Sequence, residues 1–199
     1  KHLNGAGVYI KSSNPTFNSV TITENTATIK GGGIYLEGES SVVLNDVTFE
    51  DNKVEVATSD VRQGAAVFSL NSNLEIYNCT IENNRSVGTQ PNTIGGGIYF
   101  KGDSMRSLTI NGATIRGNRA KDAGGIYVEN ALVQIANTVI SGNVAFNGNA
   151  GSIYSRNSTV EIINTTITGN MCGSQSTGGI YSELSNIFLI NSIVWNNES

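Results

Sequence analysis

The sequence has very little of the chemistry that most enzyme and metal sites use. Its only histidine is His2, and its only cysteines are Cys79 and Cys172. A histidine-based triad, a multi-histidine metal site and a disulfide framework therefore cannot be built from these residues. Charged residues make up only 14% of the chain, and no apolar run approaches the roughly 18 residues of a membrane-spanning helix. We expect no cofactor, no metal and no membrane span in this segment.

Charge and composition narrow the class of protein further. The formal net charge is only −4 and lysine and arginine are dispersed, which argues against a nucleic-acid partner. Disordered chains usually have high net charge or a strong polar bias, so disorder is also disfavoured. Glycine is abundant, with 23 residues against 2 prolines, and the aliphatic residues are mostly isoleucine and valine. This composition is typical of an all-β protein with many turns.

A cluster of small residues followed by an aliphatic and an aromatic residue occurs seven times. The occurrences are Gly5–Tyr9, Gly31–Tyr35, Gly64–Phe68, Gly95–Tyr99, Ala123–Tyr127, Ala150–Tyr154 and Thr177–Tyr181. Successive aromatic positions are 26, 33, 31, 28, 27 and 27 residues apart. A recurrence at 20–50 residues is the signature of a repeat architecture.

A second mark follows each cluster, namely an apolar residue three positions before an asparagine. The pairs are Ile22/Asn25, Phe49/Asn52, Ile81/Asn84, Ile115/Asn118, Ile140/Asn143, Ile167/Asn170 and Val194/Asn197. The distance from aromatic residue to asparagine is 16 to 19 residues, so this half of the unit is structurally fixed. Length variation falls in the other half.

The repeat predicts one domain over residues 1–199, folded as a right-handed parallel β-helix of about seven coils. Short alternating runs such as Val160–Ile162 indicate strands, and nothing in the unit has helical period. We expect each coil to hold three short strands and three turns, because a coil can bury its apolar face only against the next coil. Parallel crossovers are almost always right-handed.

The two marks also predict what each column of the stack does. The aliphatic residue of the glycine cluster and the apolar residue before the asparagine should both point into the core. The asparagine should lie where a strand turns, because asparagine tolerates left-handed backbone geometry. Its amide should hydrogen-bond to the asparagine of the next coil, which would form a ladder.

The paired marks resemble the Gly-Gly-Ala-Ile and Phe-x-x-Asn repeats of the polymorphic outer membrane proteins, which are bacterial surface autotransporters. Phe49-Glu50-Asp51-Asn52 matches the second repeat literally, and isoleucine or valine replaces phenylalanine in the six other coils. The resemblance covers essentially the whole chain, once per coil. It implies a surface-exposed β-helical passenger engaged in adhesion, located extracellularly or at a bacterial outer membrane.

The aromatic column is the first candidate binding surface. If the aliphatic residue of each cluster points inward, strand alternation turns the next residue outward. The candidates are Tyr99, Tyr127, Tyr154 and Tyr181, in line with Tyr9, Tyr35 and Phe68. An exposed stripe of rings can bind sugars or a partner's apolar surface. The alternative is a structural ladder that stabilises cross-strand pairing.

The sequence offers further candidates for function. Two long loops, residues 53–63 and 85–94, lie on consecutive coils, and long loops on a rigid scaffold commonly carry recognition.

Asp46, Glu50 and Asp51 share one coil, but Asn78 stands where a carboxylate would stack on Asp46. We therefore interpret them as a solvated acidic edge and expect no catalytic residues. Cys79 and Cys172 lie three coils apart, which is too far for a disulfide.

The functional prediction is a non-catalytic cell-surface or secreted segment that acts as an adhesin or structural spacer. Its partner would be a protein or glycan ligand at a cell surface. The alternative is a fragment of a carbohydrate-active β-helix protein that binds or degrades polysaccharide. Because coils one and seven both carry the full repeat, we also expect a longer natural protein or end-to-end self-association.

Overall fold

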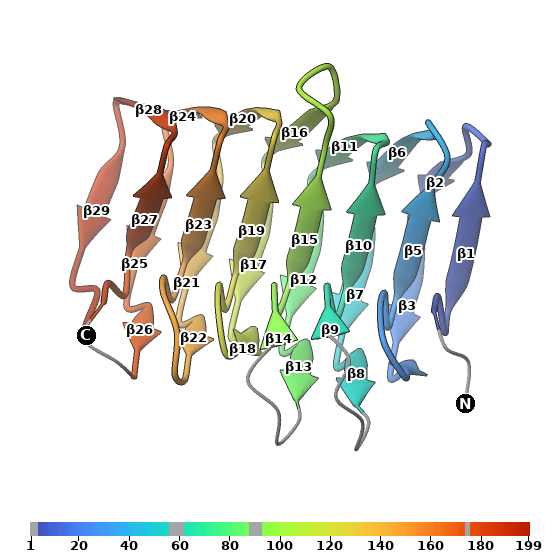
Figure 1. Cartoon of the computed structure of the whole chain (residues 1–199), viewed down its shortest axis with the longest axis horizontal. Coiled ribbons are helices and arrows are strands. Elements are labelled where there is room, and N and C mark those ends of the chain that lie inside the picture. The colour runs from blue at the N-terminus through green and yellow to red at the C-terminus, as the bar shows by residue number, and fades with distance from the viewer. Residues whose placement is uncertain (1–3, 56–61, 88–92, 174–175) are drawn as a thin grey trace.

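The protein is a four-sided parallel β-solenoid in which each coil contributes one strand to each side, except that the seventh coil has no strand on the fourth side (Figure 1). The computed structural model describes residues 4–55, 62–87, 93–173 and 176–199. These residues form strands, bends and turns, and no helix lies among them. All strand pairs within these ranges are parallel, and each strand pairs with its equivalents in the neighbouring coils.

The first sheet carries the glycine-cluster strands and lies in front in Figure 1. Its strands are β1 (Val8–Lys11), β5 (Ile34–Glu37), β10 (Val67–Leu70), β15 (Ile98–Lys101), β19 (Ile126–Glu129), β23 (Ile153–Arg156) and β27 (Ile180–Glu183). The second sheet follows it in each coil. Its strands are β2 (Thr16–Asn18), β6 (Ser41–Asn45), β11 (Asn73–Tyr77), β16 (Ser107–Asn111), β20 (Leu132–Ala136), β24 (Thr159–Ile163) and β28 (Asn186–Ile190).

The third sheet carries the apolar residue of the asparagine mark. Its strands are β3 (Thr21–Thr23), β7 (Thr48–Glu50), β12 (Thr80–Glu82), β17 (Thr114–Arg116), β21 (Val139–Ser141), β25 (Thr166–Thr168) and β29 (Ile193–Trp195). The fourth sheet follows the asparagine. Its strands are β4 (Thr26–Ala27), β8 (Lys53–Glu55), β13 (Arg85–Val87), β18 (Arg119–Ala120), β22 (Val144–Ala145) and β26 (Met171–Cys172). A separate pair joins β9 (Arg62–Gln63) and β14 (Thr93–Ile94).

The all-β parallel solenoid predicted from the repeat is confirmed, with two differences. Three sheets have seven strands and the fourth has six, so the chain completes about six turns and the seventh coil lacks its fourth strand. Six of the seven coils also have a strand in a fourth sheet, where the prediction was three strands per coil. The fourth strand was missed because most of its members are two residues long, which is too short to show alternation.

The core follows the predicted columns. The main hydrophobic cluster contains the inward residues of the first three sheets, and Ile34, Ile81 and Ile115 are fully buried within it. Leu189 and Val194 of the seventh coil belong to the same columns by register but are exposed, because no further coil of this chain packs on them.

The asparagine ladder predicted from the second mark is confirmed in every coil. Each asparagine except the last, Asn197, donates through Nδ2 to Oδ1 of the next one, over 2.8–3.0 Å. The backbone N–H of the same six asparagines also donates to the Oδ1 of the next one. The left-handed residue is not the asparagine itself, which was the prediction, but the residue before it. This position holds Glu24, Asp51, Asn83, Gly117, Gly142, Gly169 and Asn196.

The backbone packs closely around Gly124, where the fourth sheet meets the first. A Cβ added there would lie 2.5–2.6 Å from three backbone atoms of Val144, so Gly124→Ala should lower the free energy of unfolding by about 1–3 kcal/mol through overpacking. Gly169 is the control, because its φ is +62° but no atom lies within 4 Å of an added Cβ. Urea denaturation of both variants measures the difference, and a larger loss for Gly169→Ala would contradict this packing argument.

Candidate functional site

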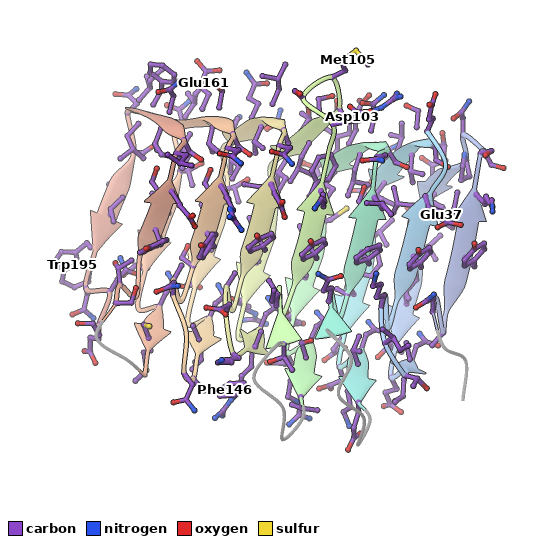
Figure 2. All side chains as sticks on the ribbon, viewed as in Figure 1. Glu37, Asp103, Met105, Phe146, Glu161 and Trp195 are labelled. Carbon is purple, nitrogen blue, oxygen red and sulfur yellow. The ribbon has the colours of Figure 1, made fainter. Side chains whose placement is uncertain are left out.

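The aromatic column forms one continuous stack across seven coils, visible as a row of rings on the front sheet in Figure 2. Centroids of neighbouring rings lie 4.8–5.2 Å apart. Except for Tyr9, which is half exposed, the members belong to a hydrophobic cluster separate from the main core. The prediction that they lie on the outer face of the strand is therefore correct, and the stack matches the structural-ladder alternative.

Burial limits what this column can offer a ligand. The exposed fraction is 4% at Tyr99, 6% at Tyr127 and 8% at Tyr154, while Tyr181 is partly buried. Each ring face is occupied by the next ring, so a sugar could not stack on an inner member. Residues from the turn before the glycine cluster add cover, since Lys30 Nζ lies 4.9 Å from the centroid of Phe68. Ligand binding by the four tyrosines stays a prediction.

A column of alternating charge runs beside the rings. It contains three ion pairs between adjacent coils, Lys11–Glu37 at 3.5 Å, Lys101–Glu129 at 3.1 Å and Arg156–Glu183 at 3.5 Å. Tyrosine hydroxyls donate to the same carboxylates, as Tyr35 does to Glu37 over 2.8 Å. The tyrosines and the charged column therefore satisfy each other, which indicates a structural role.

The buried tyrosines have perturbed acidity. Burial, together with the carboxylate of Glu129, raises the pKa of Tyr127 to about 12. Burial is also the largest cause that raises the pKa of Tyr35, Tyr99 and Tyr154 above the ordinary value of about 10.

These shifts predict alkaline unfolding. Above pH about 10 an unfolded tyrosine loses its proton while the folded stack keeps it, so the folded state binds more protons. The stabilisation is complete below pH about 10 and is lost as pH rises towards about 12. Urea midpoints and tyrosinate absorbance across an alkaline pH series measure this. Ordinary tyrosine ionisation in a protein that remains folded would contradict it.

The two long loops lie partly outside the described residues, which omit positions 56–61 and 88–92. Their far ends are described and pair with each other, since Arg62 is in register with Thr93 and Gln63 with Ile94. The first residues of the two loops form strands β8 and β13 of the fourth sheet, which pair with each other. Both loops therefore leave the same edge of the solenoid, as their consecutive positions in the repeat predict.

The acidic residues of the second coil do not converge. Glu50 lies in register with Glu82, whose carboxylate pairs with the guanidinium of Arg116. Across the described ranges, no group of three or more His, Cys, Asp and Glu side chains is placed to share a metal ion. Cys79 and Cys172 are both buried and are not joined by a disulfide, and burial raises the pKa of the Cys79 thiol.

A row of basic residues on the surface of the fourth sheet was not identified from the sequence. Lys53, Arg85 and Arg119 lie in register on β8, β13 and β18. We call these three residues the basic row. Arg85 and Arg119 are exposed and Lys53 is partly exposed. A signal was present, because each follows directly after the ladder asparagine, at Asn52, Asn84 and Asn118.

This geometry defines a class, the parallel β-solenoids with an asparagine ladder and an aromatic stack. Comparison with known families matches residues 1–131 to the family described as "Right handed beta helix region". The match spans more than half of the chain, so the chain belongs to the right-handed β-helix family, and the predicted hand is confirmed. No curated protein and no solved structure matches the chain. None of the described segments is a helix with the length and hydrophobicity needed to cross a membrane.

Proposed function

We propose that this chain is a non-catalytic, extracellular or cell-surface β-helix that acts as a rigid spacer with an adhesive surface. The supporting observation is the unbroken register of the first three sheets from the first coil to the seventh. Six coil spacings of about 4.8 Å give a rod segment roughly 29 Å long. A stack closed by columns of side chains has little freedom to bend, which suits a spacer.

The paired repeats favour a more specific hypothesis within this proposal. They resemble the repeats of the polymorphic outer membrane proteins once per coil, and on this resemblance we propose that the chain is a passenger segment of that autotransporter type. Its partner would be a protein or glycan on an opposing surface. End-to-end association through the exposed apolar end of the seventh coil belongs to the same proposal.

Adhesion and catalysis give opposite results in one pair of assays. The chain immobilised on beads should retain cells or arrayed glycans above the level of albumin-coated beads, and should leave the viscosity of polysaccharide solutions unchanged. A steady fall in viscosity caused by this chain would contradict the proposal and support the carbohydrate-active alternative. Absence of retention on every surface and glycan would reject an adhesive role.

A further inference from the structure

The basic row places three cations one coil apart along the axis of the solenoid. Lys53 pairs in register with Arg85, and Arg85 with Arg119, on strands at the lower edge of Figure 1. Since adjacent parallel strands are about 4.8 Å apart, the three positions span about 10 Å. The long side chains point away from the core, because the next residue of each strand is the buried one.

The charges of the basic row are not neutralised by the protein in the part of the chain that the structure describes. The ion pairs of the described residues involve Lys11, Lys101, Arg106, Arg116 and Arg156. None of them involves a residue of the basic row. Like charges placed directly opposite each other destabilise a sheet. The comparable acidic pair Glu50 and Glu82 is relieved by Arg116. The basic row therefore lacks the internal compensation that the other charged columns have.

The row borders a groove that can receive a ligand. The groove has a volume of about 350 Å³ and is lined by Asp51, Asn83, Arg85, Gly117, Arg119 and Val144. The Arg119 guanidinium carbon also lies 5.5 Å from the centroid of the Phe146 ring, which holds the side chain in place and adds an apolar surface. Figure 2 labels Phe146 at this edge. Asp51 is the one carboxylate in the lining.

We propose that the basic row binds a linear acidic polysaccharide, whose carboxylate or sulfate groups follow the row along the axis. This inference rests on the proposed adhesive function and names its ligand class. An extended acidic peptide fits less well, because its same-side residues repeat at about 6.6–6.8 Å and not at the coil spacing. Nucleic acid is disfavoured, because the chain has a net charge of −4 and the row is one residue wide.

The test uses two acidic probes, chondroitin sulfate and hyaluronan, and neutral dextran. We expect the whole chain to bind at least one acidic probe, with an affinity that falls as salt rises, and not to bind dextran. Binding to both acidic probes would assign recognition to carboxylate, and binding to chondroitin sulfate alone would assign it to sulfate. Equal binding to dextran would overturn the proposal.

Two double variants carry the same change in charge at different places. Arg85→Ser/Arg119→Ser removes two row cations and should weaken binding at least about tenfold, with an unchanged or higher Tm because like-charge repulsion is relieved. Lys11→Ser/Arg156→Ser removes two cations from the first sheet and should change affinity less than about twofold. Equal loss in both variants, or no loss in the first, would overturn the proposal. If the chain binds cells or neutral glycans but neither acidic probe, this inference fails while the adhesive function stands.

Discussion

Replacement of Asn84 by alanine is expected to lower the free energy of unfolding by about 3–6 kcal/mol, a large part of the roughly 5–15 kcal/mol that stabilises a typical domain. Asn84 is fully buried. Its Oδ1 accepts from the backbone N–H and from Nδ2 of Asn52, both over 3.0 Å, and its Nδ2 donates to the carbonyl oxygen of Phe49 over 3.0 Å. Alanine would remove all three bonds from a buried position, and the backbone N–H of Asn52 would lose its bond to the Asn84 side chain, while Asn52 Nδ2 would keep only its bond to the carbonyl oxygen of Ile22.

Asn45 provides the matched control in the same assay. It is partly exposed and donates one side-chain hydrogen bond, to Oδ1 of Asn18 over 2.8 Å. Asn45→Ala should therefore cost only about 0.5–1 kcal/mol. Urea denaturation followed by circular dichroism compares the two variants. A loss below about 1 kcal/mol for Asn84→Ala would show that the ladder is not a major source of stability.

Truncation of Tyr127 to alanine is the second large effect, expected at about 3–5 kcal/mol. Its ring lies between Tyr99 at 4.9 Å and Tyr154 at 5.0 Å and is almost fully buried. Removal opens a gap in the stack, and the parallel backbones on either side keep their spacing and cannot close it. Both stacking contacts and the apolar contact area of the ring are lost together.

Tyr127→Phe separates the ring from its hydroxyl. This variant keeps both stacking partners and loses the hydrogen bond that the hydroxyl donates to Glu129 over 3.3 Å, so the cost should stay below about 1 kcal/mol. Thermal and urea unfolding of both variants measure the contrast. If Tyr127→Ala kept full stability but lost cell or glycan binding, the stack would be a ligand site and the structural interpretation would be wrong.

Much of the fold could be predicted because each column repeats once per coil. The inward positions Ile34 and Ile81 and the asparagine ladder follow from residue type and spacing alone. The burial of Tyr127 could not be predicted, because alternation tells which face a side chain takes but not what covers that face. The cover of Tyr127 comes from the neighbouring rings of Tyr99 and Tyr154, and at Phe68 the turn residue Lys30 adds to it.

The fourth sheet and the basic row were missed for a related reason. Coils differ in length after the asparagine, so residues of that region align only once the register is known. Val144 and Arg119 lie in one column although they differ in chemistry, and no hydrophobic pattern marks their strands. Reading each coil forward from its asparagine aligns Lys53, Arg85 and Arg119 at once.

The direction of the backbone hydrogen bonds has a mechanical consequence. In this solenoid they run between coils, along the long axis, and the two chain ends lie at opposite ends of that axis (Figure 1). Tension applied between the ends therefore pulls a terminal coil from its one neighbour, while inner coils keep two neighbours. Such a rod should lengthen in steps of one coil, about 27 residues at a time in its C-terminal half, where successive tyrosines are 27 residues apart. A surface spacer with this property would absorb a sudden load gradually while its remaining coils kept their shape.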